Sequence, residues 1–118
     1  MRNMSFAMTP DQILQQTKTV TRRFGWWELK PGTLVQPVRK AMGLKKGERV
    51  ERLGPPIRIV SVRQERLGAI TPEDVVKEGF PTWTPAQFED MLCKQYRITP
   101  DAICNRIEFE YTEVGSGE

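Results

Sequence analysis

The hydrophobic residues of this 118-residue chain alternate with polar or small residues in several short segments. Such alternation places one side of each segment in a core, and it predicts strands over residues 3–8, 33–38 and 57–66. Residues 18–23 are rich in β-branched side chains and are predicted to be a strand or an extended turn. The apolar residues of the segment 102–113 indicate a final strand. The chain therefore has enough strand-forming sequence for a small sheet.

The dipeptide Thr-Pro occurs three times at the start of a segment with helix-forming character. Threonine is a good N-cap and proline fits the first helical position, so each dipeptide predicts a helix N-terminus. The predicted helices cover residues 10–16, 72–79 and 85–96, and the third has its apolar side chains on one face. Strands before and after helices indicate an α+β domain around a small antiparallel or mixed sheet, with closure into a barrel as one possible arrangement.

The length of the chain suits one domain with a single core, so residues 1–118 are predicted to form one unit. Residues 40–56 combine glycine and proline with many lysines and arginines, and we expect a basic inserted loop or hairpin extension there. Residues 114–118 are small or polar and are expected to be a frayed tail.

The formal net charge of +3 conceals a strong segregation of charge. Residues 18–66 contain 13 basic and four acidic side chains, so this stretch carries +9 and the remainder −6. Such a stretch is typical of a surface that binds the phosphates of a nucleic acid. It is also compatible with an ordinary solvated face of a soluble domain.

The absence of histidine excludes Ser-His-Asp and Cys-His catalysis. Cys93 and Cys104 lack the spacing of a zinc site, so no metal and no cofactor are expected, and both thiols are predicted to be free. No apolar run reaches the roughly 20 residues of a membrane-spanning helix. We expect a cytoplasmic protein with no membrane partner, and we take it to be a monomer.

Three sequence landmarks occur in a recognisable order. They are Gln-Thr-Lys-Thr-Val-Thr-Arg-Arg at 16–23, Lys-Pro-Gly at 30–32 and Ile-Thr-Pro-Glu-Asp-Val-Val-Lys-Glu-Gly-Phe at 70–80. Together they resemble the ASCH domain family, over roughly residues 4–111. The resemblance implies a PUA-like small β-barrel of about five to six strands with two to three packed helices, and a cleft for RNA or a nucleoside. Gln16 and Thr33 depart from the family pattern, which often has glycine and aspartate at these places.

The resemblance also implies a possible reaction. Some small bacterial ASCH proteins are amidohydrolases that remove the acetyl group of N4-acetylcytidine with a lysine, a threonine and a glutamate, without a metal. The matching residues in this chain are Lys18, Thr21 and Glu78. A lysine with a depressed pKa is able to take the proton of a threonine hydroxyl, and a carboxyl group to orient the substrate or to protonate the leaving amine.

A second hypothesis is a non-catalytic RNA-binding module or a ribonuclease-like RNA-processing protein. Arg22 and Arg23 would contact phosphate or substrate, while Trp26 and Trp27 lie close enough in sequence for one of them to stack on a base. A third is an interaction domain whose basic loop docks an acidic partner. Each of these residues also has an ordinary structural explanation, as a surface, strand or core residue.

Overall fold

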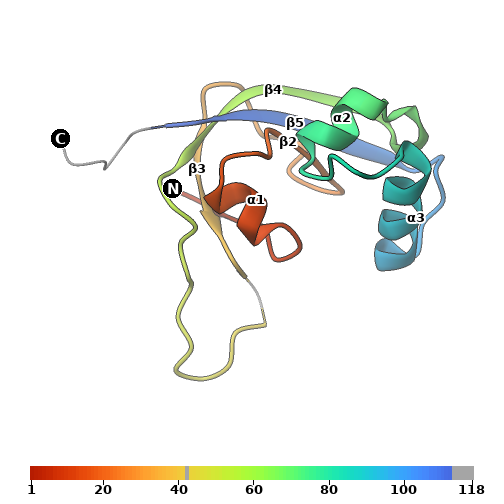
Figure 1. Ribbon diagram of the computed structural model, residues 1–118. Helices are drawn as coiled ribbons and strands as arrows, with labels where there is room; N and C mark the ends of the chain where they lie inside the picture. Colours follow the sequence, from red (N-terminus) through yellow and green to blue (C-terminus); the bar gives the residue numbers. More distant parts are fainter. Residues whose placement is uncertain (42, 113–118) are drawn as a thin grey trace.

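The computed structural model describes residues 1–41 and 43–112 and contains a sheet with helices packed against it (Figure 1). The expected tail at 114–118 lies outside the described residues. The elements in chain order are β1 (Asn3–Ser5), α1 (Pro10–Leu14), β2 (Val20–Arg23), β3 (Leu34–Val38), β4 (Ile57–Arg66), a 3₁₀ turn (Leu67–Ala69), α2 (Pro72–Lys77), α3 (Pro85–Tyr96) and β5 (Ile103–Tyr111).

The five strands form one mixed sheet in the order β1-β3-β4-β5-β2. β1 runs parallel to β3, and the other neighbours are antiparallel. The expected α+β class is confirmed, and the five strands and three helices fall within the five to six strands and two to three helices that the resemblance implied. Within the described residues β1 and β2 are the two edges of the sheet, so it does not close into a barrel.

Two hydrophobic clusters stabilise the fold. The larger one joins α1 to the strands and includes Met4, Phe6, Ile59 and Phe109. The smaller one lies between the 3₁₀ turn, α2 and α3, and includes Phe88. Phe6 of the larger cluster and Phe88 of the smaller one both line the pocket of the candidate site.

The helix N-termini follow the predicted Thr-Pro pattern, but the three threonines differ in what they do. Thr71 accepts a hydrogen bond from the backbone N–H of Asp74, and Thr84 forms a reciprocal capping box with Gln87. Thr9 makes no capping hydrogen bond with its side chain; it is buried and faces the candidate pocket instead. The first Thr-Pro pair therefore starts a helix and also supplies a polar side chain to the site.

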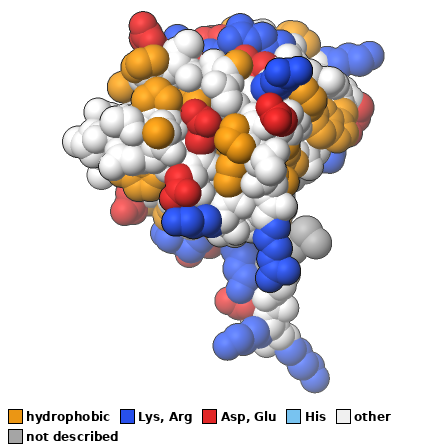
Figure 2. All heavy atoms as spheres, turned by 90° about the vertical axis from the view of Figure 1, so that its right-hand side faces the viewer, with side chains coloured by type: hydrophobic (Ala, Val, Ile, Leu, Met, Phe, Trp, Pro, Cys, Tyr) orange, Lys and Arg blue, Asp and Glu red, His pale blue; other side chains and the backbone are white. Residues whose placement is uncertain are grey.

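The predicted basic loop between β3 and β4 projects from the body of the protein (Figures 1 and 2). We refer to residues 39–41 and 43–52 as the basic arm. Its base is fixed by an antiparallel bridge between Val38 and Arg52 and by a hydrogen bond from the backbone N–H of Leu53 to the carbonyl of Pro37, at 2.9 Å. Pro37 lies next to the end of β3, where it is in register with Met4 of β1 and beyond the residues that pair with β4.

No helix in residues 1–41 and 43–112 has the length and apolar composition that a membrane crossing requires.

Candidate functional site

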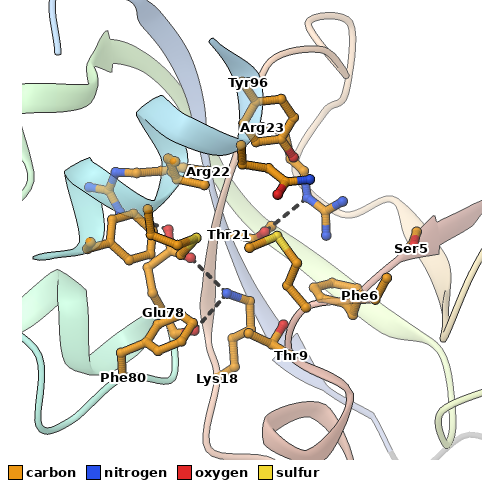
Figure 3. A pocket seen from close by; sticks show the side chains of 16 residues that line it. Ser5, Phe6, Thr9, Lys18, Thr21, Arg22, Arg23, Glu78, Phe80 and Tyr96 are labelled. Atoms are coloured by element: carbon orange, nitrogen blue, oxygen red, sulfur yellow. Dashed lines mark hydrogen bonds and ion pairs between the residues drawn. The ribbon is translucent and has the colours of Figure 1, made fainter. Parts of the chain in front are cut away.

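A pocket of about 250 Å³ lies between β2, the residue that follows α2, and α3 (Figure 3). Its polar side carries Lys18, Thr21, Arg22, Arg23 and Glu78. Its apolar side is formed mainly by one face of α3. The remaining lining residues are Ser5, Phe6, Ala7, Met8, Thr9, Phe80, Phe88, Met91, Leu92, Gln95 and Tyr96.

Lys18 and Glu78 form a buried ion pair at the base of the pocket. Lys18 Nζ donates one hydrogen bond to Glu78 Oε1 and one to the Glu78 backbone carbonyl, each at 2.7 Å. Their side chains are only 4% and 3% exposed. The main chains are tied together as well, because the Thr19 N–H donates to the carbonyl of Lys77 at 2.8 Å. The end of α2 and the start of β2 therefore hold the pair in place.

The environment of Lys18 lowers its pKa from the ordinary value of 10.5. Burial is the main cause, because removal from water disfavours the charged ammonium. The charges of Arg23 and Arg22 act in the same direction, whereas the Glu78 carboxylate opposes them. A lysine of this kind is able to lose its proton more easily than one at the surface.

Arg22 connects Glu78 to a wider network of buried charges. Its Nη1 donates to Glu78 Oε2 at 3.1 Å, and its Nη2 contacts Asp74 Oδ2 at 2.6 Å and Glu65 Oε2 at 2.7 Å. Arg106 holds Asp74 through two further hydrogen bonds, of 2.7 and 3.0 Å. The Arg22 guanidinium is therefore occupied by three carboxylates, which position it as a support for Glu78.

This network changes the acidity of its members. Hydrogen bonds from Arg106, and then those from Arg22, lower the pKa of Asp74 far below its ordinary value, although burial opposes them. For Arg22, burial disfavours the charged form, but the hydrogen bonds to Asp74, Glu65 and Glu78 and the charge of Glu78 outweigh burial and raise its pKa. Both groups are therefore firmly ionised, and they act as fixed charges beside the pocket.

Thr21 and Arg23 are two residues apart on β2, so their side chains lie on the same face of the strand. Arg23 Nε donates to Thr21 Oγ1 at 3.0 Å, and its guanidinium carbon lies 4.7 Å from the centre of the Phe6 ring. Burial lowers the pKa of Arg23. Because Thr21 accepts this hydrogen bond, its own hydroxyl proton remains available to another acceptor.

The structure brings Lys18, Thr21 and Glu78 to one pocket, and Figure 3 shows the Lys18 ammonium and the Thr21 hydroxyl facing the same space. Among the described residues, Lys18 is hydrogen-bonded to Glu78 but not to Thr21. The geometry thus offers an amine and a hydroxyl in one pocket, with a carboxylate bound to the amine.

The two adjacent tryptophans lie outside this pocket. Trp26 packs against the larger hydrophobic cluster, with the Arg2 guanidinium carbon 4.0 Å from the centre of its ring. Trp27 is 48% exposed but does not line the pocket. The aromatic rings that do line it are Phe6, Phe80, Phe88 and Tyr96.

Sequence reasoning missed two parts of the site. It gave no site role to the apolar face of α3, although Met91 and Tyr96 line the pocket. It also gave no role to Asp74, Glu65 or Arg106. The Thr-Pro-Glu-Asp landmark could have drawn attention to Asp74, but Glu65 and Arg106 carry no local signal, because their place depends on the register of β4 with β5.

The described residues contain no group of three or more His, Cys, Asp or Glu side chains arranged to hold a metal ion. The carboxylates of Glu78, Asp74 and Glu65 accept hydrogen bonds from ammonium and guanidinium groups instead. The chemistry that the site offers is therefore that of an amine, a hydroxyl and fixed charges.

Comparison with solved structures identifies the fold. An ASCH domain from Lactobacillus crispatus JV V101 matches with a TM-score of 0.59 and 17% identity, over 92% of this chain and 77% of that one. A protein of the DUF984 family from Enterococcus faecalis V583 matches with a TM-score of 0.57 and 14% identity, over 94% of this chain and 74% of that one. This chain folds as an ASCH-like domain. No family model and no curated protein matches its sequence. At these identities the likeness concerns the fold alone.

Proposed function

We propose that this ASCH-like domain is an amidohydrolase that removes an acyl group from the exocyclic nitrogen of a nucleoside, with N4-acetylcytidine as the expected substrate. The observation that carries the proposal is that the buried Lys18–Glu78 pair and Thr21 line one pocket. These are the three residues at which the sequence resembles the amidohydrolases of the ASCH family.

The size and lining of the pocket support a small, flat ligand. Its volume of about 250 Å³ lies below the roughly 300–1,000 Å³ of pockets for drug-sized ligands. Phe80, Phe88 and Tyr96 offer aromatic surface to a base, and the polar groups lie on the other side. A single base and its acyl group suit this division better than several bases of a strand.

The first half of the reaction forms an acyl-enzyme. With Lys18 neutral, its Nζ accepts the Thr21 hydroxyl proton while Thr21 Oγ1 attacks the acyl carbon. The carbon–nitrogen bond then breaks, and the leaving amine receives the proton that Lys18 took. The depressed pKa of Lys18 favours the neutral amine that this step needs.

The second half returns the enzyme to its starting state. Water attacks the threonine ester while Lys18 accepts a proton from the water. The bond between the acyl carbon and Thr21 Oγ1 then breaks, Lys18 returns its proton to Oγ1, and the acetic acid that is released loses its own proton to solvent. Arg23 donates to the threonine oxygen that reacts, so its positive charge lies beside the negative charge that develops at the acyl group. Glu78 holds Lys18 in position throughout.

Incubation with N4-acetylcytidine and detection of cytidine test the proposal directly. The informative variants are Thr21→Val, which keeps the shape of the side chain, and Lys18→Met. Thr33→Val and Lys30→Met are the matched controls, because both residues are exposed and lie outside the pocket. We expect a loss of at least about 100-fold in kcat/KM for the site variants, the low end of one general-base contribution, and unchanged controls. Turnover that survives Thr21→Val in folded protein would refute the threonine mechanism.

A further inference from the structure

The basic arm is a defined structure rather than a loose loop. Its two ends are paired, because the backbone N–H of Arg39 donates to the carbonyl of Glu51 at 2.9 Å. Its tip is a closed turn in which the backbone N–H of Glu48 donates to the carbonyl of Lys45, and Glu48 Oε1 accepts from the N–H of Lys45. Leu53 anchors the returning chain in the core and is 2% exposed.

The acidic groups of the arm are used within the arm itself. Glu48 closes the turn at the tip, and Glu51 forms an ion pair of 3.1 Å with Arg39. The other five cations are exposed and have no acidic partner within the described part of the chain; they are Lys40, Lys45, Lys46, Arg49 and Arg52. Figure 2 shows Lys and Arg side chains along much of the projecting arm. The six cations and two carboxylates of the arm give it a net charge of 6 − 2 = +4.

The arm begins beside the candidate site. Ser5 lines the pocket, and its hydroxyl donates to the backbone carbonyl of Arg39, the first residue of the arm, at 3.4 Å. A nucleoside within a strand has a phosphate on each side. A strand with one base in the pocket therefore brings its flanking phosphates toward the arm.

We propose that the basic arm binds the phosphates of single-stranded RNA and that the substrate of the pocket is an acylated nucleotide within such a strand. This inference rests on the proposed function for the identity of the reaction. Cationic side chains that neutralise phosphates release counterions, so binding through the arm depends steeply on salt. RNA is favoured over an acidic protein because the arm starts at a pocket whose size and aromatic lining suit a base.

The test compares two substrates in two variants. The substrates are free N4-acetylcytidine and a short single-stranded RNA that contains one N4-acetylcytidine. The arm variant is Lys45→Ala, Lys46→Ala, Arg49→Ala. The control variant removes the same charge from exposed positions of the body, with Lys30→Ala, Arg66→Ala, Lys94→Ala.

For the RNA substrate, we expect the arm variant to lose about 10- to 100-fold in kcat/KM at low salt. The slope of log kcat/KM against log salt concentration should become less steep by about 2, because three cations are removed and each phosphate contact contributes about 0.7. For the free nucleoside, kcat/KM should not change. The control variant should resemble the wild type on both substrates. Equal effects of the two variants on RNA, or no preference of the wild type for RNA over the nucleoside, would overturn the inference.

Failure of the proposed function gives a different result. If wild-type protein releases no cytidine from either substrate, filter binding of the same RNA still measures how much the arm contributes to RNA affinity. Weaker binding by the arm variant alone then supports the RNA surface, and equal binding by both variants rejects it. Binding of polyglutamate as tight as that of RNA also rejects it, in favour of an acidic protein partner.

Discussion

Lys18 is bound to Glu78 in two ways, through the side-chain carboxylate and through the backbone carbonyl of the same residue. The carbonyl contact does not depend on the identity of the side chain at position 78. Loss of the carboxylate charge should therefore leave Lys18 in place but change its acidity. The effect of the Glu78 charge on Lys18 can therefore be measured without moving the Lys18 side chain.

Glu78→Gln should shift the pH dependence of kcat/KM to lower pH. Burial lowers the pKa of Lys18 from 10.5, and the Glu78 charge partly opposes this shift. Without that charge the pKa falls further, so neutral Lys18 and maximal turnover are reached at a lower pH. The profile is measured with N4-acetylcytidine, with Glu73→Gln on the exposed face of α2 as the control. An unshifted or upward-shifted profile would contradict the assignment of Lys18 as the base.

Asp74→Asn should destabilise the protein by about 3–5 kcal/mol, because it leaves Arg22 and Arg106 buried with one counterion fewer. Equilibrium unfolding in urea measures this loss. The natural control is Asp101→Asn, which changes an exposed carboxylate. A loss below 1 kcal/mol would show that Arg22 and Arg106 do not need Asp74.

The lowered pKa of Asp74 also predicts how the stability of the protein changes with pH. The pKa of folded Asp74 lies below its ordinary value of 3.8, so its stabilising ion pairs are fully present above about that pH and are lost as the pH falls toward the folded pKa. Unfolding free energies of the wild type should therefore drop in this acidic range. The drop should be smaller in Asp74→Asn, which has no such proton to take up.

The secondary structure was largely predictable from the sequence, since its signals are local. Thr-Pro pairs marked all three helix starts, and alternation marked β4 at its observed bounds. The buried charge network was not predictable, because Arg22, Asp74 and Arg106 come from three elements that only the tertiary fold brings together. The aromatic lining of the pocket was not predictable for a related reason. Trp26 and Trp27 are close to the basic motif in sequence. The α3 rings that line the pocket with this motif, Phe88 and Tyr96, are distant from it in sequence and close only in the folded structure.

Gly79→Ala should lower stability more than Gly32→Ala. Both glycines have a positive φ, of 101° and 89°, so alanine strains the backbone at either position, by about 1–3 kcal/mol. Only at Gly79 would the added Cβ meet another group, since it would lie 2.8 Å from Gln12 Cγ; at Gly32 nothing lies within 4 Å. Thermal unfolding of the two variants isolates the difference. Equal losses would mean that Gln12 moves aside at no cost.

The two cysteines should differ in reactivity. Cys104 is buried, and burial raises the pKa of its thiol to about 11, whereas Cys93 is partly exposed. At pH 8 a thiol reagent should label Cys93 in the folded protein and reach Cys104 only after unfolding. Mass spectrometry of labelled peptides measures this, and Cys93→Ser should leave the folded protein almost unlabelled. Rapid labelling of Cys104 under native conditions would contradict its packing.

The contacts between α2 and the start of β2 are needed to keep Glu78 at the site. α2 has only six residues, too few to remain helical alone, and the links from Thr19 to Lys77 and from Lys18 to Glu78 join it to the sheet. Glu78 therefore holds Lys18 only while this helix is docked. The proposed activity therefore depends on this local docking, and it should vanish under mild denaturation while the long β4–β5 ladder is still intact.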